Sequence, residues 1–307
     1  MKNKMIRLCL AMLILLPTIA CTATEDSIDS AKALYNKGIT FGEKGNLNEE
    51  IATYDEVVKI YGTSTDLALL ELVAQSLYNK GGALSDQNKL DEAIANYDEI
   101  IKGLNNSSED LLQKILAMSL VRKGNIFRKQ GKLNEAVSNY NNIIERFSSS
   151  SNPALHERVA TALTNKGTVL GEQGKLDEAI ASCDEMIKRF GLSTAPELQP
   201  IIAKNIVNKG IMLSTQGKLD SAIASFDDAI NRYKQSTEPK IQGEVANAFI
   251  KKAAALYEKD KTDEAITCYD ELIQLFDKSE VLDLQEMVTG ARSNRDFMLS
   301  QKKLSVN

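Results

Sequence analysis

The residues that could carry out chemistry are few and scattered. His156 is the single histidine, and no constellation of serine, cysteine or acidic residues surrounds it in the sequence. A nucleophilic site needs such neighbours, so we interpret His156 as a surface residue. Glycine-rich loops of the kind that cradle phosphate are also absent from the sequence. These observations argue against an enzyme with a recognisable mechanism.

Three Asp-Glu pairs have the residue types of paired catalytic carboxylates or of a metal site. They are Asp55-Glu56, Asp98-Glu99 and Asp184-Glu185. In each pair the aspartate lies four residues before a lysine, at Lys59, Lys102 and Lys188. That is the spacing of exposed ion pairs on one helix, and a solvated helix face explains the pairs fully. We therefore predict no catalytic residue, no metal site and no cofactor.

The chain that must position any functional residue is strongly periodic. A Lys-Gly pair recurs every 43 residues, at Lys37-Gly38, Lys80-Gly81, Lys123-Gly124, Lys166-Gly167 and Lys209-Gly210, with Lys252-Ala253 as a degenerate sixth copy. A fixed period predicts an array in which each unit buries its apolar face against its neighbours. Such arrays favour binding over chemistry.

Within one period the pattern predicts two antiparallel helices. In the fourth copy, Leu163, Gly167 and Leu170 have helical spacing, and Gly174 supplies a left-handed turn, a place that Asn88 and Asp260 take in two other copies. Residues able to cap the next helix follow at Asn48, Asp91, Asn134, Asp177, Asp220 and Asp263. Small residues come next at Ala93, Ala136, Ala179, Ala222 and Ala265, where Glu50 departs from the pattern. A larger side chain stands one turn later, at Tyr54, Tyr97, Tyr140, Cys183, Phe226 and Tyr269.

This pattern resembles the tetratricopeptide repeat over residues 31–276, in six copies. The resemblance implies an all-α fold, a right-handed superhelical solenoid of antiparallel helix pairs, and residues 280–301 continue the register as a terminal capping helix. Two departures are a lysine before the first glycine, where the family has a large residue, and the missing proline after the second helix. The period of 43 residues also exceeds the family's usual 34.

The additional residues precede each first helix and are themselves patterned. Residues able to cap a helix recur at Thr65, Ser108, Ser151, Thr194 and Thr237, and prolines follow two residues later at Pro153, Pro196 and Pro239. Apolar residues follow them at fixed positions of the 43-residue period. We therefore predict first helices of about 20 residues, or roughly 30 Å. Pro200 falls inside one of these helices and should kink or delay it.

The family resemblance also implies where a partner would bind, because its first helices line the concave face. The family's usual contact positions map here to Tyr35, Asn36, Tyr78, Asn79, Arg122, Asn125, Asn165, Asn208 and Lys251. Asparagine can hold the backbone of an extended peptide in either direction, and Arg122 could meet a carboxylate. An equally weighted alternative is that the asparagines hydrogen-bond to neighbouring helices of the same chain.

Some members of the family clamp a C-terminal carboxylate with lysine and asparagine residues from three successive repeats. Asn125, Asn165 and Lys204 match this clamp in part, but Val121 and Asn208 stand where basic residues are expected. The longer first helices also change the geometry. We therefore do not predict the clamp here.

The N-terminus has the pattern of a secretory signal over residues 1–20. A basic start precedes the apolar run from Leu8 to Leu16, and small residues follow. The segment from Pro17 to Cys21 resembles a bacterial lipobox, which predicts lipidation of Cys21, with cleavage near Ala20 or Ala23 as the alternative. Residues 21–30 would then be a short tether to an exported, periplasmic protein, anchored to the outer membrane if lipidated.

Composition narrows the classes of partner. The formal net charge is −5, and the basic leader makes the remaining chain more acidic still, which excludes a broad footprint for nucleic acid. Cys183 and Cys268 lie too far apart in the repeat geometry for a disulfide, and we interpret both as buried apolar side chains.

The sequence thus predicts a non-enzymatic scaffold or adaptor of the cell envelope that binds an extended peptide or a helix of a partner protein. Contact with a membrane would occur only through Cys21. The alternatives are a regulatory or substrate-presenting subunit of an envelope enzyme, or a glycan binder.

Overall fold

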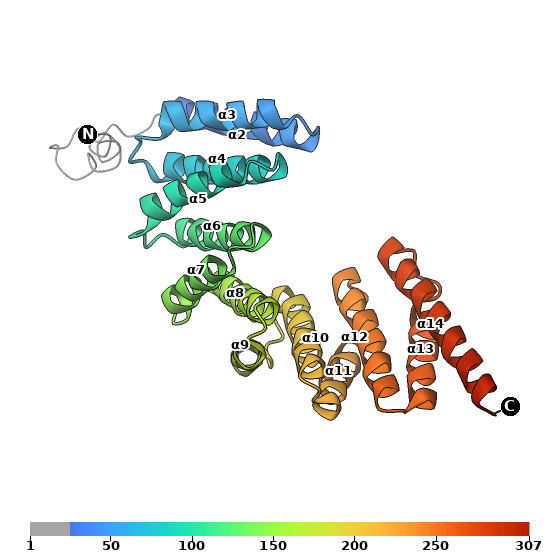
Figure 1. The fold of residues 1–307 in the computed structure, drawn as a ribbon. Helices are drawn as coiled ribbons and strands as arrows, with labels where there is room; N and C mark the ends of the chain where they lie inside the picture. The colour runs from blue at the N-terminus through green and yellow to red at the C-terminus, as the bar shows by residue number, and fades with distance from the viewer. Residues whose placement is uncertain (1–24, 307) are drawn as a thin grey trace. The chain divides into compact units, whose positions relative to one another are not determined.

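A computed structural model describes residues 25–306 of the chain (Figure 1). The predicted signal segment and the predicted lipidation site at Cys21 lie outside the described residues. All regular structure in the described range is helical. Seven first helices are α2 (Glu25–Glu43), α4 (Leu67–Asp86), α6 (Asp110–Lys129), α8 (Pro153–Glu172), α10 (Gln199–Thr215, after the short 3-10 helix η2, Pro196–Leu198), α12 (Pro239–Glu258) and α14 (Leu282–Val306). Six second helices are α3 (Leu47–Tyr61), α5 (Leu90–Leu104), α7 (Leu133–Phe147), α9 (Leu176–Phe190), α11 (Leu219–Tyr233) and α13 (Thr262–Phe276).

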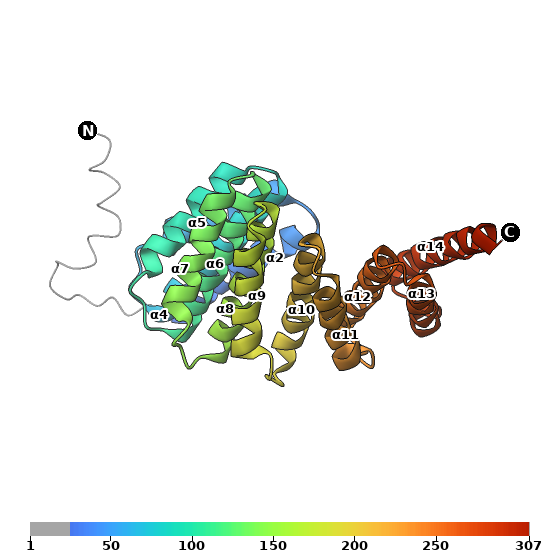
Figure 2. The same cartoon turned by 60° about the horizontal axis from the view of Figure 1, so that its bottom comes forward.

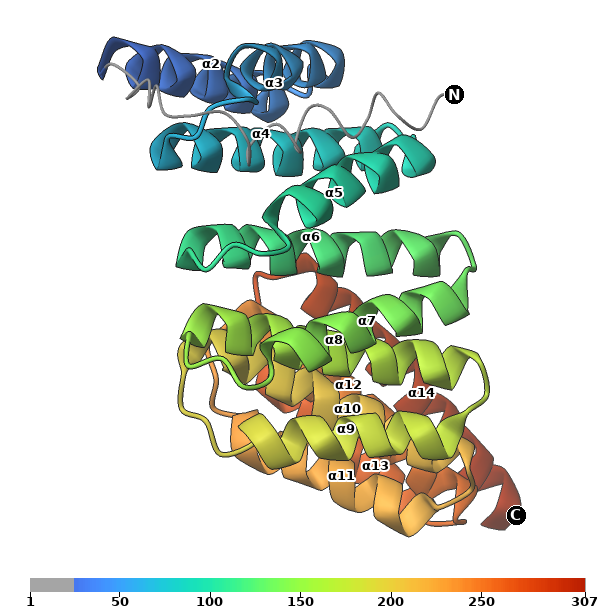
Figure 3. The ribbon, with the colours of Figure 1, turned by 90° about the vertical axis from the view of Figure 1, so that its left-hand side faces the viewer.

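The helices belong to two compact units, of which one ends at Arg158 and the other begins at Val159, inside α8. In the first unit, α3 packs between α2 and α4, and each of the first helices α2, α4 and α6 also contacts the next (Figure 3). In the second unit, α10, α12 and α14 contact one another in the same order, and the second helices α9, α11 and α13 pack against them (Figure 2). Each unit is therefore an array of antiparallel helix pairs, as the periodicity predicts.

The core lies where the two helices of a pair cross. The large side chain of the second helix is at most 3% exposed in every pair, at Tyr54, Tyr97, Tyr140, Cys183, Phe226 and Tyr269. The small residues before it, Ala93, Ala136, Ala179, Ala222 and Ala265, are fully buried. An alanine permits the close approach of two helices, and the larger side chain then fills the groove beside the glycine of the Lys-Gly pair. Both predicted positions are confirmed.

The predicted turn and helix lengths are also confirmed. The residue between the two helices has positive φ in all six pairs, at Gly45, Asn88, Gly131, Gly174, Gly217 and Asp260. Glycine adopts this conformation without strain, and asparagine and aspartate tolerate it better than most residues. The helices α4, α6, α8 and α12 each have 20 residues. Pro200 delays its helix, because α10 begins only at Gln199 and Pro200 lies in its first turn.

The predicted caps are wrong, because the N-cap lies two residues earlier in the second helices and one residue later in the first helices. The second helices begin at Leu47, Leu90, Leu133, Leu176, Leu219 and Thr262, one residue before the predicted caps, and none has a side-chain cap. The predicted cap residues instead bind the following pair: Asp91 accepts from Gln130 Nε2 at 2.9 Å and Asp177 from Gln216 Nε2 at 2.9 Å. Before the first helices, the N-cap follows the predicted residue, as at Asp66, which accepts from two backbone amides. Thr65 and its equivalents are therefore not the caps.

The predicted ion pairs within single helices are wrong as well. Asp55 Oδ1 lies 2.6 Å from Lys80 Nζ, on the next first helix, rather than beside Lys59. The same contact recurs between Lys123 and Asp98, Lys209 and Asp184, and Lys252 and Asp227. The aspartates remain about half exposed, so they form the solvated face that the sequence indicates. The lysine at this register position thus joins α4 to α3, α6 to α5, α10 to α9 and α12 to α11.

Candidate functional site

Several predicted partner-binding residues in the first unit contact each other. Asn79 Nδ2 donates to the hydroxyl oxygens of Tyr35 at 3.2 Å and Tyr54 at 3.3 Å. Burial raises the pKa of Tyr54 to about 12, although the bond to Asn79 acts in the opposite direction. Asn79 therefore holds α4 against the preceding helix pair.

Arg122 makes the equivalent contact one period later. Its Nε donates to Tyr78 Oη at 3.1 Å, and its guanidinium carbon lies 5.8 Å from the centre of the Tyr78 ring. The hydrogen bond to Tyr78 is the main reason that the pKa of Arg122 is raised. The side chain remains exposed, so it is fixed in place while its outer face stays available to a partner.

The remaining predicted residues are less uniform. Asn125 Oδ1 accepts from Tyr140 Oη at 2.7 Å, and Asn208 Nδ2 donates to Thr168 Oγ1 at 3.3 Å. Asn36 and Lys251 are exposed, and Asn165 is half-buried. Some of the predicted asparagines are therefore engaged in hydrogen bonds within the chain, which agrees with the alternative given in the sequence analysis. Binding of a partner by these residues stays a prediction.

His156 has a structural role that the sequence analysis missed. Its Nε2 lies 2.7 Å from the carbonyl oxygen of Ser150, in the turn before α8. Side-chain amides make the same bond to the equivalent serine in four other turns, from Gln113, Gln199, Gln242 and Gln285. The signal was available, since these residues and His156 share one register of the 43-residue period. His156 is thus half-buried and anchors a turn, rather than lying free on the surface.

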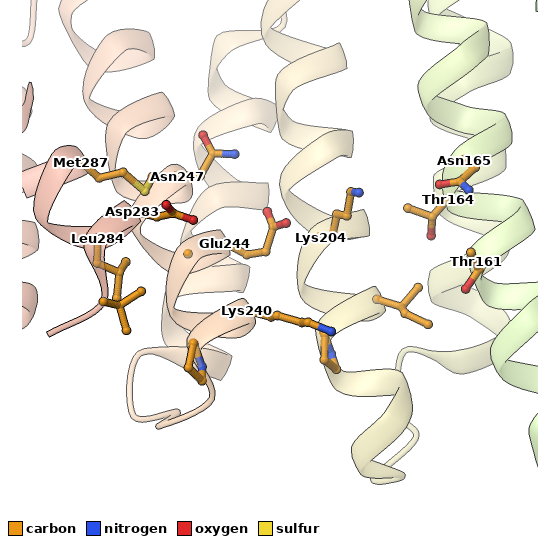
Figure 4. Close-up of a pocket in the computed structure, with 15 residues that line it drawn as sticks. Thr161, Thr164, Asn165, Lys204, Lys240, Glu244, Asn247, Asp283, Leu284 and Met287 are labelled. Atoms are coloured by element: carbon orange, nitrogen blue, oxygen red, sulfur yellow. The ribbon is translucent and has the colours of Figure 1, made fainter. Parts of the chain in front are cut away.

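The first helices of the second unit form a groove of about 630 Å³, shown in Figure 4 and here called the α8–α14 groove. Its lining comes from α8 (Thr161, Thr164, Asn165), α10 (Pro200, Ile201, Lys204), α12 (Pro239, Lys240, Gly243, Glu244, Asn247) and the start of α14 (Val281, Asp283, Leu284, Met287). Apolar side chains lie beside amides, hydroxyls and charges of both signs. This combination suits a polypeptide segment, whose side chains and backbone need both kinds of contact.

Four ionisable side chains line the groove, and the environment of Glu244 is the one that clearly changes its pKa. Burial raises the pKa of its carboxyl group, while the charge of Lys204 and a hydrogen bond from Asn247 counter the shift. Lys204 and Lys240 are exposed, and Figure 4 shows the Lys240 ammonium reaching toward α10. The groove therefore presents two accessible cationic groups beside the partly desolvated carboxylate of Glu244 and the exposed carboxylate of Asp283.

Sequence reasoning found only part of this groove. It identified Asn165, and it considered Lys204 as part of an incomplete carboxylate clamp. It missed Lys240 and Glu244, which lie in the additional turns that lengthen each first helix, and Asn247, at the start of the sixth copy. The pattern of a single repeat does not show which of these turns approach each other in space.

Two other features have no counterpart in residues 25–306. No group of three or more histidine, cysteine or acidic side chains there is placed to hold a metal ion. Likewise, no helix in the described range is long and apolar enough to span a membrane. Cys183 and Cys268 are free and buried, and burial raises the pKa of their thiols to about 12 and about 11. The raised pKa favours the protonated form of both thiols, which is the less nucleophilic one.

Solved structures with a similar fold share little sequence with this chain. BtubC (BKLC) from P. vanneervenii is 15% identical, with a TM-score of 0.61 over 75% of this chain and 90% of its own. The apo form of RapI is 11% identical, with a TM-score of 0.54 over 89% of this chain and 99% of its own. A Rap protein complexed with Competence and Sporulation Factor is 12% identical, with a TM-score of 0.52 over 91% of this chain and 84% of its own. A search of curated proteins found no match.

Models of the tetratricopeptide repeat match residues 31–63, 74–102, 115–185 and 247–279, which together make up just over half of the chain. The matched segments overlap the helix pairs α2–α3, α4–α5, α6–α7, α8–α9 and α12–α13. The alanine and aromatic residues on which the resemblance rests lie in the core of these pairs. A protein of this family is generally a scaffold for protein–protein interaction. The chain is a member of the tetratricopeptide repeat family.

Proposed function

We propose that this protein is a non-enzymatic scaffold that binds an extended segment of a partner protein in the α8–α14 groove. The observation that carries the proposal is the groove itself, which four successive first helices line with apolar, amide and charged side chains. An extended segment lying across these helices would bury apolar side chains on Ile201, Leu284 and Met287. Its backbone would find hydrogen-bonding partners at Asn165 and Asn247.

Both the fold and the charges of the groove support this proposal. A Rap protein of similar fold is complexed with Competence and Sporulation Factor, so helix arrays of this kind accommodate ligands. In the present groove, Lys204 and Lys240 favour an acidic side chain or a terminal carboxylate on the segment. Each buried hydrogen bond would contribute about 1 kcal/mol, and a charged one roughly 1.5–3 kcal/mol.

We further propose that the scaffold acts in the cell envelope, attached through a lipidated Cys21. The supporting observations are the basic start, the short apolar run and the lipobox-like segment of the N-terminus. Few residues separate Cys21 from α2, so the helix array would be held close to the membrane surface.

The groove can be tested by photo-cross-linking in cells. A photoreactive amino acid at Met287, which lines the groove, should capture a partner. The same probe at Glu178, exposed on the second helix α9, should not. Capture from Glu178 and not from Met287 would place the partner on the second-helix face and overturn the assignment.

A matched pair of glycine substitutions separates blocking of the groove from damage to the fold. A Cβ atom at Gly243 would meet nothing within 4 Å, and the residue lines the groove, so Gly243→Leu adds a side chain to the groove from an open position. Gly290 in α14 has equally open surroundings but lies outside the groove. We expect Gly243→Leu to abolish cross-linking from Met287 and Gly290→Leu to preserve it, with equal helical content by circular dichroism. Equal cross-linking by both variants would refute groove binding.

A further inference from the structure

A second pocket, of about 280 Å³, lies among the first helices of the other unit. We call it the Glu50 pocket. Its lining comes from α2 (Ile39, Gly42, Glu43), α3 (Glu50, Tyr54), α4 (Tyr78, Asn79, Gly82, Ala83, Asp86) and α6 (Arg122). Its volume is at the lower end of the range for small-molecule sites, so it suits one side chain rather than a whole ligand.

Glu50 is the residue that makes this pocket unusual. In the five other helix pairs its register position holds a fully buried alanine, and here a carboxylate takes that place and is only 9% exposed. The carboxyl group lies against α2, where a Cβ atom on Gly42 would approach its oxygens to 2.9 Å. None of the hydrogen bonds or ion pairs among the described residues involves this side chain. The carboxylate oxygens are not among the buried atoms without a partner, so they reach the open space of the pocket, where a partly desolvated charge favours an oppositely charged partner.

The surroundings of Glu50 add negative rather than positive charge. Burial raises the pKa of Glu50, and the charge of Asp86 raises it further. Glu43 and Asp86 line the same pocket, and both are exposed. Arg122 is the one cationic residue in the lining, and its Nε is already bonded to Tyr78. With all groups ionised, three carboxylates would face a single guanidinium.

The aromatic residues of the pocket complete a site for a cation. The lining includes Tyr54 and Tyr78, and Arg122 already rests over the ring of Tyr78. Aromatic faces attract ammonium and guanidinium groups, and their contribution grows when the cation is desolvated. A metal ion suits the pocket less well, because its carboxylates are not grouped as the ligands of one ion in the described structure.

We propose that the Glu50 pocket binds the cationic end of a lysine or arginine side chain presented by a partner protein. The ammonium or guanidinium group would pair with the Glu50 carboxylate, with Asp86 and Glu43 at the mouth of the pocket. Its methylene groups would lie against Ile39 and the tyrosine rings. The site lies in a different unit from the α8–α14 groove, so it can be tested without reference to that groove.

The first test uses short peptides and the whole protein. The probe is the pentapeptide Gly-Gly-Lys-Gly-Gly, acetylated and amidated at its ends, and its arginine equivalent. The glutamine equivalent is the neutral control. We expect the lysine or arginine peptide to shift backbone resonances of residues 39–54 and 78–86 in a titration followed by NMR, and the glutamine peptide to bind at least about tenfold more weakly. Equal binding of the neutral peptide would overturn the proposal.

Two substitutions distinguish a specific site from general attraction by an acidic surface. Glu50→Gln keeps the shape of the side chain and removes its charge, whereas Glu49→Gln removes the same charge from the exposed neighbour outside the pocket. We expect a loss of affinity of about tenfold or more for Glu50→Gln and little change for Glu49→Gln. Equal losses of affinity in the two variants would mean that the peptide is attracted by the acidic surface in general, and would refute specific binding in the Glu50 pocket.

The stability of the Glu50→Ala variant distinguishes a binding role of Glu50 from a structural role. The variant restores the alanine of the other helix pairs and removes an unpaired buried carboxylate. We expect it to unfold at a higher denaturant concentration than the native chain while it loses peptide binding. A lower unfolding midpoint would mean that Glu50 supports the fold, and the binding role would be abandoned. Blocking the α8–α14 groove with Gly243→Leu should leave peptide binding unchanged.

Discussion

The glycines of the Lys-Gly pairs lie against the large core side chains of the second helices, and substituting them tests how tightly the two helices of a pair are packed. A Cβ atom on Gly124 would lie 2.6 Å from Tyr140 Cε1 and 3.0 Å from Asn139 Nδ2. Tyr140 is fully buried, so its ring has little room to move. At Gly167, where Cys183 replaces the aromatic ring, the nearest atoms are Cys183 Sγ and the Ala179 carbonyl oxygen, both at 3.3 Å. The same substitution should therefore have different effects at the two sites.

Two opposing terms set the size of the effect. Replacing a helical glycine with alanine contributes about 0.5–1 kcal/mol of stability, because glycine loses more backbone freedom on folding. Overpacking a buried contact costs about 1–3 kcal/mol. We expect Gly124→Ala to destabilise the chain by about 1–2 kcal/mol and Gly167→Ala to stay within about 1 kcal/mol of the native value. At the equivalent position of the last pair, Ala253 is fully buried, so one copy of this packing includes a methyl group, which argues against a larger cost.

Urea denaturation of the protein would measure these differences in stability, and hydrogen exchange would locate them. The stability of a helix array is a sum of local units and their interfaces, so protection should fall first in α6 and α7 for Gly124→Ala. A double mutant supplies the control: in a Tyr140→Cys background the additional cost of Gly124→Ala should disappear. If Gly124→Ala is as stable as the native protein, the close crossing at Tyr140 is not rigid and the reasoning fails. Gly167→Leu, which adds a whole side chain at the looser site, should still cost about 1–3 kcal/mol or more.

Three further predictions concern other parts of the chain. His156→Gln should preserve stability, because glutamine makes the same turn contact in four other places, whereas His156→Ala should lose about 1 kcal/mol in urea denaturation; equal losses would remove the anchoring role. Because the folded state raises the pKa of Glu50 above its ordinary 4.5, the folded chain retains a proton that the unfolded chain releases. The native chain should therefore lose stability relative to Glu50→Gln as the pH rises from 4.5 toward neutrality, and a pH-independent difference in unfolding midpoint would contradict this. Mass spectrometry of the mature protein should find a diacyl or triacyl Cys21, and an unmodified N-terminus at Cys21, Thr22 or Thr24 would exclude the lipid anchor.

The sequence alone predicts most of the fold because its decisive signals are local and repeated. The turn glycines, with Asn88 and Asp260 in their place, mark a backbone conformation that other residues adopt poorly. Alanine and the aromatic residue after it mark a close helix crossing. The additional residues of the long period keep helical spacing, and the structure makes them helix. Repetition strengthens each of these weak signals, since errors at one copy are corrected by the others.

The caps and ion pairs were predicted less well, and the physical reason is the same for both. Asp55 and Asp91 have suitable partners within their own helix and also on the next helix pair. Local spacing cannot rank these alternatives, because the cost of ordering the side chains depends on packing between pairs. In the structure the following pair provides the partner, through Lys80 and Gln130. His156 was misread for a related reason, since its partner is a backbone carbonyl in a turn.

The candidate sites depend most on the tertiary structure. The sequence by itself determined the helix array and the positions of the small and large core residues. It also placed Asn165 and Lys204 on first helices. Only the packing of successive helices decided that Asn79 and Arg122 bind tyrosines, that Lys240 and Glu244 share a groove, and that Glu50 is buried without a partner. Residues on different repeats form a site only through the distances between helices. Those distances follow from the packing of every side chain between the helices, which no single repeat encodes.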